Sequence, residues 1–131
     1  MKITNFAVFN AIEPLNKLVL LKLPIKVGFS LLKTIKKIDE INSLVTKKRE
    51  EIVNTYASRN ADGSVVKSKD AAGNDVENTV QIVNMVGFEK DMSDLMNFVN
   101  EVDVTPIKVV DVEHHVVELE VLAKLDWLFT E

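Results

Sequence analysis

The chain has 131 residues and a mass of 14.7 kDa, a size that suits a single domain with one small hydrophobic core. Hydrophobic residues make up 47% of it and charged residues 27%, which excludes an intrinsically disordered protein. The absence of cysteine excludes a disulfide scaffold, a thiolate metal site and a cysteine nucleophile.

Neither a membrane nor a secretory route is expected. The longest nearly charge-free apolar stretch, residues 16–23, contains two lysines and is far shorter than the ~20 residues that a spanning helix needs. The opening residues MKITNF lack a small-residue cleavage site behind an apolar run, so they do not resemble a secretory signal. We therefore expect no membrane partner, and a location in a bacterial-type cytoplasm or in a particle assembled there.

Charge is distributed unevenly along the chain. Residues 1–60 hold eleven Lys and Arg against five Asp and Glu, whereas residues 61–131 hold five against fifteen. A basic half can mark a nucleic-acid footprint. Here acidic residues interrupt the lysines and no aromatic stacking platform accompanies them, so we expect the two halves to neutralise each other by packing and do not expect nucleic acid as a partner.

The N-terminal region, residues 1–27, predicts a helix and a connector. Thr4 is a candidate N-cap, and Phe6, Phe9 and Ile12 share one side of the helix that follows it. Pro14 either kinks this helix or begins a second helical piece. Residues 23–28, with Pro24, predict a short connector.

A long amphipathic helix is predicted over residues 28–58. Leu31, Ile38, Val45 and Ile52 recur every seven residues, and Ile35, Ile41 and Tyr56 widen this apolar stripe. Asn42 and Arg49 interrupt it, and polar residues at such positions usually fix the register of a packed helix.

A second helix is predicted over residues 84–101, with Asn84 as its N-cap. Its apolar residues are spaced three and four apart, the pattern of a helix packed on another helix: Met85, Phe88, Met92, Leu95, Val99 and Val102. Its outer face is acidic. We therefore predict an antiparallel helical hairpin of residues 28–58 with 85–101.

The remaining segments predict a small β component and a terminal helix. Turn sequences at 60–63 and 70–74 indicate a β-hairpin over residues 59–83, with a mobile loop as the alternative. Residues 102–131 predict a strand and then a C-terminal helix, about 118–129. The predicted fold class is α+β, mainly helical, with short terminal helices around the hairpin.

Unequal helix lengths suggest where a partner binds. The long helix offers thirty-one residues to a second helix of about seventeen, so part of its stripe needs cover from the terminal helices or from a partner. Trp127 and its neighbours form an apolar patch that is either core or an interface anchor. The candidate interaction residues are Leu31, Ile38, Val45, Ile52, Tyr56, Trp127 and Phe129.

The sequence offers no pattern for catalysis. Its four glycines are isolated, which excludes a phosphate-binding loop, and no nucleophile-elbow, zinc-helix or calcium-loop motif occurs. The only histidines, His114 and His115, are adjacent, so their side chains diverge and are poorly placed to chelate one ion. We expect no catalytic residue, cofactor or metal site.

Several segments resemble a group of small proteins of uncharacterised function carried by phages and prophages of Gram-positive bacteria. They are LNKL at 15–18, KLPIKVGF at 22–29, KKREEIVNTY at 47–56, DLMNFVNEVDV at 94–104 and ELEVLAKL at 118–125. Each segment is a structural element rather than a chemical motif. Pro14 and the histidine pair depart from the pattern. The resemblance implies a phage origin and a non-enzymatic role.

The predicted function is protein–protein association without catalysis, as a phage assembly or virion-associated component. Its partner would be a phage or host protein, or a second copy of the chain in a homo-oligomer. One alternative is an inhibitor of a host enzyme or defence protein that uses the acidic face of residues 89–103. Another is a nucleic-acid-binding accessory protein that uses the lysines of residues 33–49.

Overall fold

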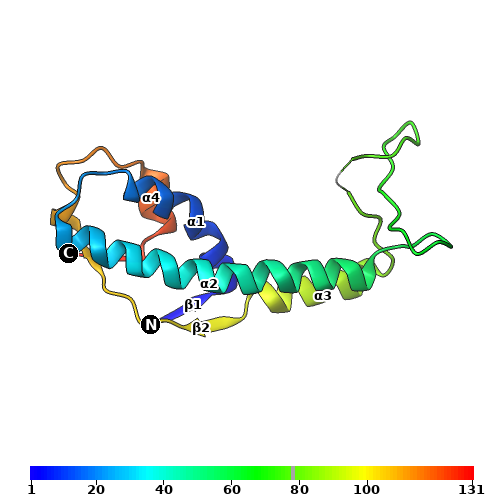
Figure 1. Ribbon diagram of the computed structural model, residues 1–131, viewed down its shortest axis with the longest axis horizontal. Helices are drawn as coiled ribbons and strands as arrows, with labels where there is room; N and C mark the ends of the chain where they lie inside the picture. The colour runs from blue at the N-terminus through cyan, green and yellow to red at the C-terminus, as the bar shows by residue number, and fades with distance from the viewer. Residues whose placement is uncertain (78) are drawn as a thin grey trace. The chain divides into compact units, whose positions relative to one another are not determined.

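The structure is a computed structural model that describes residues 1–77 and 79–131, and it is mainly helical α+β (Figure 1). This confirms the predicted fold class. The helices are α1 (Asn5–Val19), α2 (Ile25–Tyr56), α3 (Met85–Met96) and α4 (Leu119–Lys124). The strands are β1 (Lys2–Thr4), β2 (Val99–Glu101), β3 (Ile107–Lys108) and β4 (Phe129–Thr130), and a 3₁₀ turn covers Val109–Asp111.

Two compact units make up the chain. Unit 1 contains residues Met1–Leu44 and Asn97–Glu131, and unit 2 contains Val45–Met96. Helix α2 contributes residues to both units. The hydrophobic core of unit 1 and the helix contacts of unit 2 are therefore considered separately.

The core of unit 1 forms where α1 and the first part of α2 pack as a helical hairpin, with α4 beside α1. Its fully buried leucine and isoleucine side chains come from α1, from α2 and from the segment that follows α4: Leu15, Leu18, Leu31, Ile38, Leu125 and Leu128. Burying one such side chain contributes about 1.5–3 kcal/mol of transfer free energy. This cluster is the main source of stability in unit 1.

Helix α1 begins as predicted but turns a different side toward the core. The Thr4 hydroxyl accepts a hydrogen bond from the Ala7 amide at 3.1 Å, which confirms the N-cap. The buried residues of α1 are Val8, Ala11, Leu15 and Leu18, spaced three, four and three apart, together with Asn5 and Pro14. Phe6 and Phe9 are exposed. The hydrophobic side of α1 is therefore the Val8 stripe, and Pro14 lies inside one helix rather than starting another.

Helix α2 begins earlier than the predicted connector allows. Pro24 ends the turn after α1, and the helix starts at the next residue, so Gly28 lies inside it. The Gly28 amide donates to the Pro24 carbonyl at 2.9 Å, which closes the first helical turn. A proline just before the first helical residue agrees with this start, because its fixed φ suits a helix N-terminus.

Two small sheets complete unit 1. Strands β1 and β2 pair antiparallel, with Ile3 opposite Asn100, and β3 pairs with β4 in parallel, with Ile107 opposite Phe129. The second predicted helix is therefore shorter than its spacing suggests, because residues 99–101 form β2. The Asn100 side chain fixes this pairing by donating to the Ile3 carbonyl at 3.2 Å and to Asn5 Oδ1 at 2.8 Å.

The C-terminal helix is likewise shorter than predicted. Helix α4 ends at Lys124, and Phe129–Thr130 forms β4 rather than a further helical turn. The Ile107 amide donates to the Leu128 carbonyl at 2.8 Å. The apolar residues near Trp127 had predicted a helix up to about residue 129, but the backbone there pairs with β3 instead.

Unit 2 joins the last turns of α2 to α3. The Tyr56 and Phe88 rings meet edge to face, with centroids 6.1 Å apart, and the Tyr56 hydroxyl donates to Asp91 Oδ2 at 2.6 Å. The Asn84 side chain accepts a hydrogen bond from the Gly87 amide at 3.1 Å. This is the contact expected of the predicted N-cap of α3. The end of α2 thus contacts α3 through Tyr56, whereas the helices that pack as a hairpin are α1 and α2 rather than the predicted residues 28–58 and 85–101.

Candidate functional site

The seven candidate interaction residues lie within the packing of the chain itself. Leu31, Ile38, Val45 and Ile52 are buried. Tyr56 contacts Phe88 and Asp91, whereas Trp127 and Phe129 pack partly buried against the core of unit 1. In unit 1 the long stripe is therefore covered by α1, α4 and the C-terminal segment, and exposed apolar side chains occur elsewhere.

One exposed apolar surface lies on α1. Phe6 and Phe9 are three residues apart, on the side of the helix away from its buried stripe, and are 56% and 47% exposed. An aromatic side chain of this size usually buries most of its area in a monomeric protein. The two rings therefore form an apolar face directed at solvent.

A hollow of about 500 Å³ adjoins this α1 face. Its lining comes from α1, α2 and α4: Phe9, Asn10, Ile12, Glu13, Asn16, Asn42 and Lys124. Pro14 has no N–H to donate to the Asn10 carbonyl one turn earlier, which loosens the backbone pairing of α1 at this point. The hollow thus combines an aromatic wall with several amide groups.

Asn42 is the polar residue that interrupts the stripe of α2. Its Oδ1 atom is buried and has no hydrogen-bond partner among the residues that the structure describes. A buried acceptor of this kind costs free energy unless a donor reaches it. Asn42 is thus a polar group that packing alone does not satisfy.

Ion pairs border the α1 face. Lys17 Nζ lies 3.1 Å from Glu118 Oε2 and 3.7 Å from Glu13 Oε1, and the hydrogen bond to Glu118 raises the pKa of Lys17. Lys124 Nζ lies 2.7 Å from Glu120 Oε1, and this hydrogen bond lowers the pKa of Glu120. These pairs are largely exposed, so they orient side chains more than they stabilise the fold.

A second hollow, of about 420 Å³, lies in unit 2 along α2. Its lining residues are Thr46, Arg49, Glu50, Val53 and Asn54, all from this one helix. A surface formed by a single helix is shallow and presents few convergent groups. It has less of the character of a binding site than the hollow beside α1.

Residues 57–77 and 79–84 form turns closed by isolated β-bridges, and within these described residues no regular hairpin forms. The bridges join Arg59 to Val65, Lys69 to Asp75 and Ala57 to Ile82. Both predicted turn sequences form, and Gly63 and Gly73 have φ of 87° and 84°, values that favour glycine. Mostly polar side chains leave no apolar face to order longer strands here.

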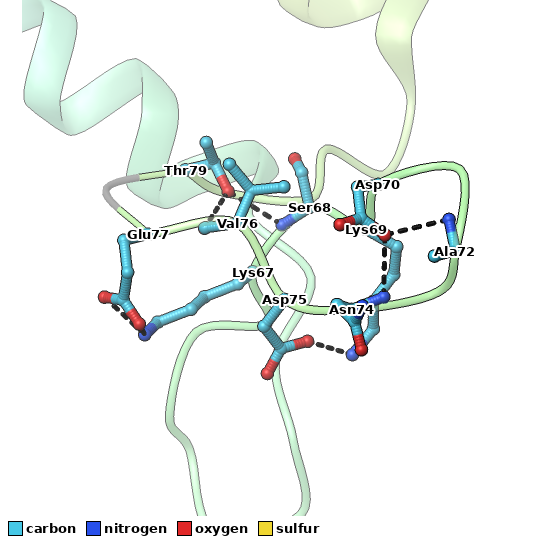
Figure 2. A network of polar contacts seen from close by, with 10 residues as sticks. All are labelled: Lys67, Ser68, Lys69, Asp70, Ala72, Asn74, Asp75, Val76, Glu77 and Thr79. Atoms are coloured by element: carbon cyan, nitrogen blue, oxygen red, sulfur yellow. Dashed lines mark hydrogen bonds and ion pairs between the residues drawn. The ribbon is translucent and has the colours of Figure 1, made fainter.

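The outer part of this loop is held by polar contacts, which Figure 2 shows. Lys67 Nζ lies 2.9 Å from both oxygens of Glu77, which raises the pKa of Lys67. Lys69 pairs with Asp75 and lowers the pKa of that carboxyl group. Each charged side chain drawn in Figure 2 pairs with an opposite charge inside the loop or accepts hydrogen bonds in its turns.

The described residues contain no side-chain cluster suited to holding a metal ion. Among them no group of three or more His, Asp or Glu side chains is close enough to hold a metal ion. The His114 side chain is 88% exposed and lies 3.5 Å from the carboxylate of Glu113. None of the helices in the described part of the chain has the length and hydropathy that crossing a membrane would require.

The exposed phenylalanines Phe6 and Phe9 are site residues that the sequence analysis did not include among its candidates. The competing stripe of Val8, Ala11, Leu15 and Leu18 was the available signal, because it continues over three turns while the Phe6 series stops.

No protein-family model matches the chain, and comparison with curated proteins and with solved structures finds no match.

Proposed function

We propose that the protein acts by binding another protein without catalysis, through the α1 face and the hollow beside it. The single observation that carries this proposal is the exposed aromatic pair, Phe6 and Phe9, at the edge of an open hollow in unit 1. Binding sites for protein partners typically combine an exposed aromatic anchor with a pocket that receives a side chain from the other protein.

The exposed area is large enough to contribute usefully to binding. Each ring has a surface of roughly 200 Å², about half of it exposed, so covering both removes about 200 Å² from water. At about 25 cal/mol per Å² this corresponds to about 5 kcal/mol before the entropic cost of association. Further contacts around the rings would be needed for tight binding.

The hollow indicates what a partner would insert. Its lining places the amides of Asn10, Asn16 and Asn42 beside apolar atoms of Phe9 and Ile12. A side chain that is apolar but carries a hydrogen-bond donor, such as tyrosine or tryptophan, matches this mixture. We therefore expect a partner with an aromatic residue at the centre of its interface.

The sequence resemblance to phage proteins supplies the setting for this proposal. The partner would be a structural protein of a phage particle, encountered during assembly or in the finished virion. A second copy of the chain is the other partner that the same surface would accept, and it would make the protein a homo-oligomer.

Photo-crosslinking tests the proposal directly. A benzophenone amino acid replaces Phe9 in one variant and the exposed Glu40 of α2 in a matched control. We expect an adduct from position 9 with one structural protein of purified particles, or with a second copy, and none from position 40. A monodisperse monomer at high micromolar concentration, without any adduct at position 9, would overturn the proposal.

A further inference from the structure

The first three turns of α2 carry a second exposed surface, different from the α1 face. Ile25, Phe29 and Leu32 are spaced four and three residues apart and are 90%, 60% and 54% exposed. Leu20, at the end of α1, is 82% exposed and precedes them by a short turn. We call these four side chains the α2 apolar corner.

The opposite side of the same turns is packed. Leu31 and Thr34 are each 1% exposed, and Ile38 is fully buried in the core of unit 1. This part of α2 is therefore apolar on two sides, and only one of them is used by the fold. An amphipathic helix of a globular protein needs one apolar side, so the second side calls for a separate explanation.

Lysines are the only charged residues near the α2 apolar corner in the sequence. Residues 14–38 contain six lysines and no aspartate or glutamate. Lys22, Lys26, Lys33 and Lys36 are exposed, and Lys33 Nζ lies 4.7 Å from the centroid of the Phe29 ring. The positive charges therefore lie directly beside the apolar side chains and are not neutralised by neighbours in the sequence.

We infer that the α2 apolar corner binds the surface of an anionic lipid bilayer. Aliphatic and phenylalanine side chains on a helix flanked by lysines are typical of helices that lie in the membrane interface. Each lysine gains free energy near an anionic leaflet, and the apolar side chains enter the boundary between headgroups and acyl chains.

The composition of the corner favours a lipid surface over a protein partner. Protein interfaces are enriched in aromatic residues, methionine and arginine and depleted in lysine. Of the enriched types the corner has only Phe29, and the charged residues near it in the sequence are all lysines. The sequence argument against a membrane concerned spanning segments, whereas interfacial binding needs only a few exposed side chains and a charge of the right sign.

The test uses sedimentation of the full chain with two kinds of vesicle, one of phosphatidylcholine alone and one of phosphatidylcholine with phosphatidylserine in a three-to-one ratio. We expect binding to the second kind only, weakening as salt is added. Leu32→Ser should lower the partition coefficient about tenfold, because it removes an inserted side chain. Leu44→Ser, at a leucine of α2 that is 69% exposed but outside the corner, is the matched control and should leave binding unchanged.

Charge is tested with a second matched pair. Lys26→Gln with Lys36→Gln should lower the partition coefficient about 25-fold, from about fivefold for each lysine at an anionic surface. Lys47→Gln with Lys48→Gln removes the same charge from a later part of α2 and should have a much smaller effect. Circular dichroism of every variant would show that the fold is retained.

Three results would overturn the inference. The first is no binding to the phosphatidylserine vesicles. The second is equal loss of binding in the corner and control variants, which would mean that net charge alone drives adsorption. The third is a protein adduct from a benzophenone amino acid placed at position 32, without any vesicle binding, which would make the corner a protein interface. None of these results bears on crosslinking from position 9, so the two proposals fail separately.

Discussion

Adjacent leucines in α2 allow the packing of unit 1 to be tested with one substitution and an internal control. Leu31 is 1% exposed and belongs to the core, whereas Leu32, about 100° further round the helix, is 54% exposed. Leu31→Ala removes three buried carbon atoms and leaves a cavity, a change that costs about 3 kcal/mol in well-packed cores. Leu32→Ala should change stability by less than about 0.5 kcal/mol.

The cost can be expressed as a melting temperature. Unfolding entropy is about 2.1 cal/mol/K per residue, which gives about 0.28 kcal/mol/K for 131 residues. A loss of about 3 kcal/mol therefore lowers Tm by about 10 °C in Leu31→Ala and by no more than about 2 °C in Leu32→Ala. Thermal and urea unfolding followed by circular dichroism would measure both variants. Equal losses, or a larger loss in Leu32→Ala, would refute this orientation of α2.

Three further predictions follow from individual contacts. Gly28→Ala should raise the free energy of unfolding by about 0.5–1 kcal/mol, because residue 28 lies inside α2 with open space around the new methyl group. Gly87→Ala should lower the free energy of unfolding, because the new Cβ would lie 3.0 Å from the Tyr56 ring. Urea unfolding compares the two variants. Asn42→Leu should raise stability by about 1 kcal/mol in the same assay, because it removes a buried acceptor without a partner, and a loss would show that the amide is satisfied. The hydrogen bond to Asp91 raises the pKa of Tyr56 above 10.0, so the stability that this bond provides is complete below about pH 10 and is lost as the pH rises through the raised value. Wild type should therefore exceed Tyr56→Phe at about pH 8, with the difference shrinking at about pH 11; a constant difference would contradict this.

The sequence predicted the fold class and its longest helix because both depend on local periodicity. A stripe repeating every seven residues, as from Leu31 to Ile52, is compatible with a helix and with little else. Caps at Thr4 and Asn84 and turns at Gly63 and Gly73 were also predictable, since each depends on a few neighbouring residues. These features need no knowledge of the rest of the chain.

The elements that differ from prediction depend on contacts distant in the sequence. Residues 99–101 continue a helical spacing, yet they pair with Lys2–Thr4 because an N-terminal strand is available almost a hundred residues away. Phe129 pairs with Ile107 for the same reason. Hydrophobic spacing does not contain this information, so helix ends were predicted less accurately than helix existence.

The candidate site was the hardest feature to predict, because core and interface use the same residue types. The strongest apolar stripe was selected for interaction, and its unit 1 members, Leu31 and Ile38, form core. Phe6 and Phe9 were predicted to share one side of the first helix, but the smaller residues Val8 and Ala11 fill the packed side. Only the packing of α1 against α2 decides which apolar side remains exposed.

Thiol labelling of single-cysteine variants tests most directly whether unit 1 presents apolar side chains to solvent. The chain has no cysteine, so each variant has a single reactive group. We predict fast maleimide labelling of Phe9→Cys and Leu32→Cys, and labelling slower by orders of magnitude in Val8→Cys and Leu31→Cys, whose positions are 0% and 1% exposed. Equal rates within either adjacent pair would contradict the exposed surfaces on which both proposals depend.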